Sequence, residues 1–275
     1  MMYMIMGRTA SGKDYFAELL KQHGLSGVKS RTTRPKRFDN EDTHIFVSQD
    51  EADKLMDRVA YTKIGNYEYF TTKNDILDKD FYIIDPIGMI SLAENMPDMI
   101  FNIIYIEADR ETRKRHFIAR QSCSKEEAEK LFDERDAAET KQFDTFENDI
   151  HAVMKSDNKN MADMELPENI RSVHTFLNQF EMDPDDIKAE ADAAVNQKKC
   201  YAILTQMTIE AISLGIITTD RNKQIAVRDK NNPNMSAYVS PEMFASFLIS
   251  DNEGLGMFMK EYLGRSNQLE IKSKI

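Results

Sequence analysis

The sequence predicts an α/β fold built on a parallel sheet, and three observations lead to this prediction. An apolar run at 3–6 is followed at once by a glycine-containing loop and then by a helical pattern over 15–22. Two further apolar runs, 81–84 and 103–106, are typical of strands buried in a parallel sheet. The overall composition, 41% hydrophobic and 30% charged, is ordinary for a globular chain.

The net charge limits the classes of partner that this chain attracts. Its 275 residues include 47 acidic and 36 basic side chains, giving a formal net charge of −11. This charge opposes indiscriminate attraction to nucleic acid or to an anionic membrane surface. We therefore expect no nucleic-acid partner and no membrane partner, and any bound anion must be held by a local basic site.

Cysteine usage and the start of the chain predict a cytoplasmic protein. Cys123 and Cys200 are far apart and in no CxxC spacing, so neither a disulfide framework nor a thiolate zinc site is expected. The apolar residues 1–6 are too short for a signal-peptide core. No later run approaches the roughly 18 apolar residues of a membrane-spanning helix.

The most specific motif is Gly-Arg-Thr-Ala-Ser-Gly-Lys-Asp at 7–14, between the first predicted strand and helix. It has the Gly-x4-Gly-Lys pattern of a phosphate-binding loop (P-loop), in which backbone N–H groups and the positive end of the helix dipole face an anion. Lys13 can reach terminal phosphoryl oxygens. The residues expected to hold the donor phosphates are Gly7, Ala10, Ser11, Gly12, Lys13 and Asp14.

Asp14 stands where a P-loop usually has a Ser or Thr that offers its hydroxyl to Mg²⁺. A carboxylate there could bind the metal directly or through water. Alternatively, it only complements the helix dipole in the first turn. Both interpretations of Asp14 remain open.

A second candidate anion site is Ser-Arg-Thr-Thr-Arg-Pro-Lys-Arg at 30–37. Arg34 and Arg37 can each make forked hydrogen bonds to a phosphate, and Ser30 can donate another. A basic run is commonly just a solvated surface. Next to a P-loop, however, this one indicates a site for the monophosphate of a second ligand.

These motifs, in this order, resemble those of the guanylate kinase family over residues 1–178. That family is a group of P-loop nucleoside monophosphate kinases with a three-layer α/β fold. Its Ser-x-Thr-Thr-Arg-x-x-Arg segment, which grips the acceptor monophosphate, is matched by Ser30, Thr32, Thr33, Arg34 and Arg37. The resemblance implies ATP and Mg²⁺ as cofactors, and GMP or dGMP as the acceptor.

The rest of the nucleoside-monophosphate-binding segment, about residues 30–80, continues the resemblance. His44 replaces the tyrosine of the family's Asp-Tyr-x-Phe-Val-Ser strand and could still donate to phosphate. The stretch 65–72 is similar to Gly-Asn-Tyr-Tyr-Gly-Thr/Ser; with one inserted residue, Tyr69 would contact the phosphate and Thr71 the base. Asp85 follows the apolar strand 81–84 in an Asp-x-x-Gly pattern, which implies an acid near the acceptor sugar and the metal.

Residues 113–142 resemble the family's lid. The stretch 126–141 predicts an amphipathic helix that presents Ala128, Leu131 and Phe132 on one face. The resemblance assigns Arg120 and Arg135 to the transferring phosphoryl group, where they would stabilise transition-state charge and help exclude water. Finally, 150–158 is similar to the family's late strand and turn on the adenine side.

One departure leaves the acceptor base open. Arg-Val-Ala-Tyr at 58–61 stands where the family has its guanine-reading glutamate. A carboxylate is the simplest acceptor for the N1 and N2 hydrogens of guanine. Asp57 or Glu68 could replace it only if the loop follows a different path.

Two alternative functions follow from these departures. Ribose 1,5-bisphosphate kinases are similar in carrying Gly-Lys-Asp and in lacking that acid, whereas the Thr-Thr-Arg-Pro-x-Arg run and the Gly-Asn-Tyr segment favour a nucleotide enzyme. The other alternative is a non-catalytic guanylate-kinase-like binding module. Such modules typically degrade the P-loop, and Gly12 and Lys13 are intact here.

The last part of the chain resembles no family that we recognise. An acidic stretch with a proline at 182–186 predicts a boundary near residue 180 between a kinase-like domain, 1–180, and a small helical appendage, 181–275. Within the appendage we expect a helix over 187–213, a hairpin of 216–219 with 224–228, and a helix starting at 240–242. The appendage could bind a protein partner or a second copy of the chain, or could only pack on the kinase core.

Overall fold

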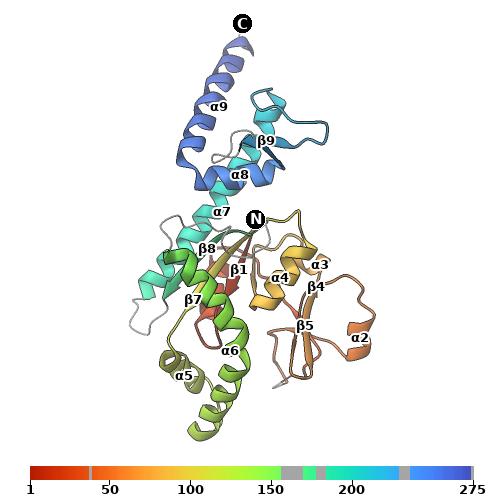
Figure 1. Cartoon of the computed structure of the whole chain (residues 1–275), viewed down its shortest axis with the longest axis vertical. Coiled ribbons are helices and arrows are strands. Elements are labelled where there is room, and N and C mark those ends of the chain that lie inside the picture. Colours follow the sequence, from red (N-terminus) through yellow and green to blue (C-terminus); the bar gives the residue numbers. More distant parts are fainter. Residues whose placement is uncertain (37–38, 156–169, 178–183, 229–235, 274–275) are drawn as a thin grey trace. The chain divides into compact units, whose positions relative to one another are not determined.

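The computed structural model describes residues 1–36, 39–155, 170–177, 184–228 and 236–273 (Figure 1). These residues divide into two compact units, Met2–Ala191 and Asp192–Ile275, the second including Met1. The boundary predicted near residue 180 falls in 178–183, outside the described residues.

The first unit is built on a parallel sheet of four strands in the order β6-β1-β7-β8 (Figure 1). The strands are β1 (Met2–Met6), β6 (Phe81–Ile83), β7 (Phe101–Glu107) and β8 (Ile170–Leu177). Every residue of β1 is buried, because this central strand is covered on both faces. The predicted parallel sheet is therefore confirmed.

Helices pack on both faces of this sheet. On one face, α4 (Pro86–Asn95) and α6 (Lys125–Lys155) form a core with Met2, Met4 and Met6 of β1. The alternate residues of β1 point to the opposite face. There α1 (Lys13–Gln22) contacts β1 and β6 and buries Phe16 and Leu20. These three layers are the α/β arrangement that the sequence predicts.

The segment 30–80 forms a second sheet in the order β3-β2-β5-β4. Its strands are β2 (Arg31–Thr32), β3 (Ile45–Phe46), β4 (Arg58–Ile64) and β5 (Tyr67–Thr72). Two short helices, α2 (Gln49–Asp53) and α3 (Lys73–Ile76), each begin with a capping box. Because β4 packs against α4, the β4–β5 hairpin lies beside the first sheet.

The helix predicted at 126–141 is the first half of α6, which follows α5 (Arg110–Ala119). It continues to Lys155, so the strand predicted from residue 150 is wrong; 156–158 lie outside the described residues. No glycine or proline interrupts 125–155, and Phe143 and Phe146 extend the buried face of the helix. The strand beside β7 is instead β8.

The second unit contains most of α7 (Pro184–Ser213), together with α8 (Pro241–Ser250) and α9 (Asn252–Ser273). The predicted helix over 187–213 is confirmed. The predicted start of α8 is also confirmed, because Ser240 caps it by accepting from the N–H of Met243. Among the described residues, no helix is both long and apolar enough to span a membrane.

The predicted hairpin of 216–219 with 224–228 is wrong in its pairing. Strand β9 (Ile225–Arg228) pairs antiparallel with β10 (Ser236–Val239). Ile216 and Ile217 donate their N–H groups back to the carbonyl of Ala211 and so close α7. The end of the expected hairpin next to its turn is nevertheless present, because Thr219 and Ile225 form an isolated antiparallel bridge and the Asp220 N–H donates to the carbonyl of Gln224 at 3.0 Å.

Candidate active site

The loop 7–12 joins β1 to α1 at the carboxyl end of a central parallel strand, the edge at which α/β sheets bind ligands. Gly7 has φ 147°, and a Cβ there would lie 2.4 Å from the carbonyl oxygen of Ile106 and 2.6 Å from Ser11 Oγ. Ala10 and Gly12 also have positive φ, 63° and 105°. A non-glycine residue at such a φ is strained, and strain of this kind concentrates at functional sites.

Lys13, the first residue of α1, folds back over this loop. Its Nζ donates to the carbonyl oxygens of Gly7, at 2.6 Å, and Arg8, at 2.8 Å. Burial lowers the pKa of Lys13 to about 8, although the nearby carboxylates of Glu139 and Asp14 act in the opposite direction. The ammonium group is thus held against the loop that the sequence predicts to bind phosphate.

Carboxylates from α6 already engage the donors of the loop. Thr9 donates its backbone N–H to Glu139 Oε2 at 2.8 Å, and its hydroxyl also bonds to Glu139. Arg8 makes a forked pair with Glu147, at 2.8 and 2.7 Å, and also pairs with Asp144. Sequence reasoning missed these contacts, whose partners lie 130 or more residues apart.

The two arginines predicted to belong to a lid pack on one aromatic ring. The guanidinium carbon of Arg120 lies 5.3 Å from the centroid of Phe117, and that of Arg135 lies 5.8 Å from the same centroid. Arg120 also lies 3.8 Å from the exposed carboxylate of Asp14. The structure therefore places Arg120 beside the first turn of α1 and Arg135 next to it.

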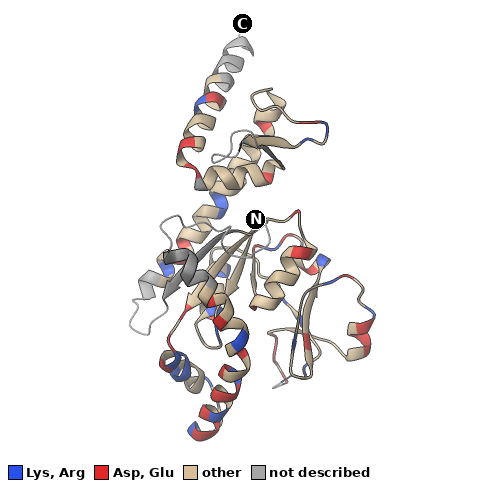
Figure 2. Cartoon of the chain, viewed as in Figure 1, with Lys and Arg blue, Asp and Glu red and all other residues tan. Residues whose placement is uncertain are grey.

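Ion pairs fix α5 against α6; Arg120 directly follows α5, and Arg135 lies in α6. Arg113 pairs with Asp136 at 2.6 Å, and both side chains are almost fully buried. Arg110 pairs with Asp136 at 3.0 Å and with Asp133 at 2.6 Å. Figure 2 shows acidic and basic residues interspersed along both helices. The spacing between the two helices is thus held by charge pairing.

Three of the residues predicted to bind the acceptor lie in contact. Ser30 Oγ and His44 Nδ1 are 2.7 Å apart, and the His44 ring packs edge-on against Tyr69, with centroids 5.7 Å apart. Arg34 forms a buried forked pair with Glu41, at 2.8 and 3.2 Å, which raises the pKa of its guanidinium. Arg37 lies outside the described residues.

Thr71 and Asp85 make contacts that stabilise local structure. The Thr71 hydroxyl is buried and donates to Asp75 at 3.4 Å. Asp85 caps α4 by accepting from the N–H groups of Ile87 and Gly88, both at 3.0 Å, and burial raises the pKa of its carboxyl group. Neither side chain lines the cavity between the β4–β5 hairpin, α4 and α6.

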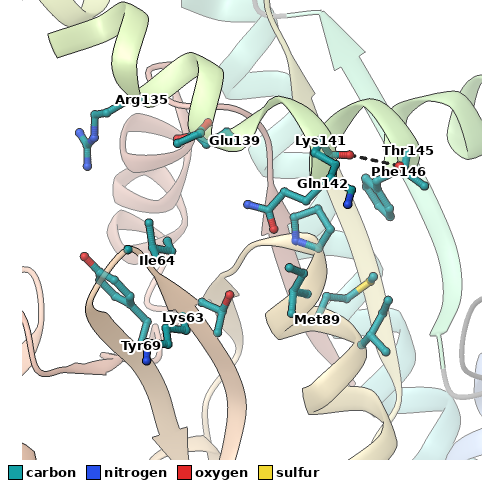
Figure 3. Close-up of a pocket in the computed structure, with 16 residues that line it drawn as sticks. Lys63, Ile64, Tyr69, Met89, Arg135, Glu139, Lys141, Gln142, Thr145 and Phe146 are labelled. Atoms are coloured by element: carbon teal, nitrogen blue, oxygen red, sulfur yellow. Dashed lines mark hydrogen bonds between the residues drawn. The ribbon is translucent and has the colours of Figure 1, made fainter.

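That cavity, of about 650 Å³, lies between the β4–β5 hairpin, the start of α4 and the middle of α6 (Figure 3). It contains one residue predicted to bind acceptor phosphate, Tyr69, and one predicted to contact the transferring group, Arg135. Glu139 also lines the cavity, and its carboxylate accepts the backbone N–H of Thr9 in the loop. The lining residues are Thr62, Lys63, Ile64, Gly65, Tyr69, Pro86, Ile87, Met89, Ile90, Arg135, Ala138, Glu139, Lys141, Gln142, Thr145 and Phe146.

The two acids that could replace a guanine-reading glutamate do not line this cavity. Glu68 pairs with Arg58 at 2.9 Å. Asp57 is exposed.

No group of three or more His, Cys, Asp or Glu side chains is arranged to hold a metal ion in the part of the chain that the structure describes. Mg²⁺ in nucleotide sites keeps several waters and binds one or two carboxylates together with phosphate oxygens. The exposed carboxylate of Asp14, at the head of α1, fits this mode of binding. Asp85 uses Oδ1 to cap α4, and its carboxyl group also hydrogen-bonds to the side chain of Thr62.

Comparison with known proteins adds little to this geometry. No protein-family model matches the chain, and no curated protein is similar to it. Among solved structures, a guanylate kinase from Anaplasma phagocytophilum is similar at 13% identity and a TM-score of 0.39. The alignment covers 72% of this chain and 84% of the other. A similarity this low supports no inference about function.

Proposed function

We propose that this protein is an ATP-dependent kinase that transfers the γ-phosphoryl group of ATP to a nucleoside monophosphate, with GMP or dGMP as the favoured acceptor. One observation carries the proposal. A phosphate loop with its lysine folded over it ends a central parallel strand, beside a cavity lined by Tyr69 and Arg135.

In this proposal the loop amides and Lys13 hold the donor phosphates. Lys13 exchanges the carbonyls of Gly7 and Arg8 for phosphoryl oxygens, and Thr9 exchanges Glu139 for phosphate. Arg120 and Arg135 neutralise charge that develops on the transferring group. Such catalysis consists of positioning and electrostatic stabilisation, since phosphoryl transfer needs little covalent help from protein.

The acceptor monophosphate is held by Ser30, His44 and Tyr69, which already lie in contact, together with Arg34 and Arg37. Glu41 keeps the Arg34 guanidinium in one orientation. Mg²⁺ would supply further charge neutralisation, and Asp14 and Asp85 are the carboxylates that would hold it.

A kinase of the ribose 1,5-bisphosphate type is the second candidate. It is favoured by the carboxylate of Asp14 directly after the loop lysine. It is also favoured by the pairing of Glu68 with Arg58, which leaves guanine without a carboxylate from this segment.

A coupled assay tests these functions with ATP, Mg²⁺ and a panel of GMP, dGMP, AMP, dTMP and ribose 1,5-bisphosphate. We expect turnover of at least one nucleoside monophosphate. Lys13→Ala should lower kcat/KM by about a hundredfold or more, because it removes a preorganised charge at the transferring group. Lys21→Ala, which removes an exposed lysine at the end of the same helix, is the matched control.

The outcomes separate the candidates. Turnover of the ribose bisphosphate alone would replace the nucleotide kinase by the second candidate. ATP binding with no turnover of any acceptor would refute the kinase proposal and leave a binding module, in which Lys13→Ala leaves protein-partner binding unchanged.

A further inference from the structure

Three isoleucines line the cavity from two elements that face it, although each is substantially exposed. Ile64 of β4 is 45% exposed, and Ile87 and Ile90 of α4 are 52% and 39% exposed. Exposed apolar side chains that converge on one hollow mark a ligand-binding groove. A sugar phosphate offers such walls little apolar surface. A nucleobase offers two flat faces.

A single amide reaches into the same cavity from the opposite side. Figure 3 shows the side chain of Gln142 extending from α6 into the space between this helix and Met89 of α4. Its Oε1 atom is buried and has no hydrogen-bond partner among the residues that the structure describes. A buried acceptor without a donor is costly, so a turn of the amide that brings Oε1 to the cavity surface would let a ligand N–H group satisfy it, which an apolar group could not do.

The positions of the other lining residues give the ligand an orientation. In Figure 3, Tyr69 and Arg135 lie on one side of the cavity and Gln142 and Met89 on the other. A monophosphate near Tyr69 and Arg135 therefore leaves its base among the isoleucines, with an edge toward Gln142.

We propose that this cavity binds the nucleobase of the acceptor nucleotide, and that Gln142 anchors the base by hydrogen bonding to its edge. The inference rests on the proposed function, which supplies the acceptor phosphate. It assigns base binding to α6, on a chain that has no guanine-reading carboxylate in the usual segment.

The chemistry of the side chain defines which base edges it can bind. A carboxamide offers one acceptor and two donors, whereas a carboxylate only accepts. Gln142 therefore matches a base edge on which an N–H donor adjoins an acceptor, as N1–H adjoins O6 in guanine and the amino group adjoins N1 in adenine. A glutamate at this position would instead favour two adjacent donors, an edge that guanine presents and adenine lacks.

Calorimetric titration of the full-length chain with GMP, AMP and ribose 5-phosphate tests the proposal. Gln142→Leu should weaken GMP binding about tenfold, since one buried hydrogen bond is lost, and should leave ribose 5-phosphate unchanged. The isosteric variant Gln142→Glu should raise the ratio of GMP to AMP affinity. Gln49→Leu, at an exposed glutamine of α2 outside the cavity, should bind all three ligands as the unaltered protein does.

The apolar walls are tested in the same way. Ile87→Ser should weaken both nucleotides several-fold without affecting ribose 5-phosphate, because it removes contact with the base alone. Leu77→Ser is the matched control, since Leu77 is equally exposed, at 55%, and does not line the cavity. A thermal unfolding scan of each variant identifies any that fails to fold.

Unchanged GMP binding by a folded Gln142→Leu variant would overturn the proposal. So would ribose 5-phosphate binding as tightly as GMP to the unaltered protein. Binding of GMP that depends on Gln142 but leads to no turnover supports the base site and refutes the kinase function. Turnover of a nucleotide at the same rate by the Gln142→Leu variant and the unaltered protein supports the kinase function and refutes the base site.

Discussion

At the scale of single residues, Lys13 carries a charge that depends on pH within the working range. Its pKa falls from 10.5 to about 8 because the ammonium is buried against the loop. The depressed value means that folding disfavours the protonated form. The resulting destabilisation is fully present below about pH 8 and is relieved as pH rises from about 8 toward 10.5.

We therefore predict that ATP affinity falls as pH rises through about 8, where the free protein loses the positive charge of Lys13. Dissociation constants measured by calorimetry from about pH 7 to about pH 9.5 check this. Lys13→Arg keeps its charge over that range, so its affinity should stay flat. Parallel profiles for the two proteins would show that another group titrates.

The carboxylate of Glu139 would repel the phosphate that the loop is expected to bind. Its carboxylate accepts the Thr9 N–H and lies close enough to Lys13 to affect the pKa of that residue. We predict that Glu139→Gln raises ATP affinity by about three- to tenfold, because like-charge repulsion with the phosphates is removed. Fluorescence titration with a labelled ATP analogue measures this. Glu134→Gln, at an exposed acid on the same helix, should have no effect, and weaker binding by Glu139→Gln would contradict the prediction.

At the scale of elements, α6 does more than cover one face of the sheet. It contributes Arg135, Glu139 and Gln142 to the cavity, and its later residues Asp144 and Glu147 hold Arg8 of the loop. Movement of this helix away from the core would therefore break the Arg8 pairs and free the Thr9 donors together. The helix and the loop are coupled through these charges.

Arg8→Met should lower the free energy of unfolding of the first unit by about 2 kcal/mol. The reason is that the part-buried carboxylate of Glu147 would lose its ion pair with Arg8 and keep only the hydrogen bond from Tyr105. The double variant Arg8→Met with Glu147→Met should recover part of this loss, because it removes both charges. Urea unfolding gives both free energies. Equal stability of Arg8→Met and the unaltered protein would show that the pair is solvated and contributes little.

The same helix shows where prediction from sequence succeeds and where it stops. Strand β1, the loop and α1 were predictable because hydrophobic spacing and glycine placement are local properties. The run after residue 150 resembled a strand because short apolar runs fit either structure, and the continuation of α6 decides between them. The contact of Thr9 with Glu139 joins residues 130 positions apart, and no local pattern encodes it.

At the scale of the whole molecule, the overall negative charge contrasts with a local cluster of basic side chains. The net charge of −11 coexists with a site at which Lys13 folds over the loop and Arg120 and Arg135 pack on Phe117. We therefore predict that phosphate affinity comes from these few groups rather than from the general field of the protein. The second unit adds exposed apolar side chains, among them Ile203 and Met257, and its role in binding a partner or a second copy stays a prediction.

The spacing along α6 has a consequence for the size of the acceptor. Arg135 and Gln142 lie seven positions apart and so about two turns, or roughly 10 Å, along the helix axis. We expect the proposed acceptor, if it touches both side chains, to be of about this length. Adapting the site to a shorter or longer acceptor would therefore require moving one of the two contacts by a full helical turn, and a one-residue insertion between them would rotate Arg135 away from Gln142 by about 100°.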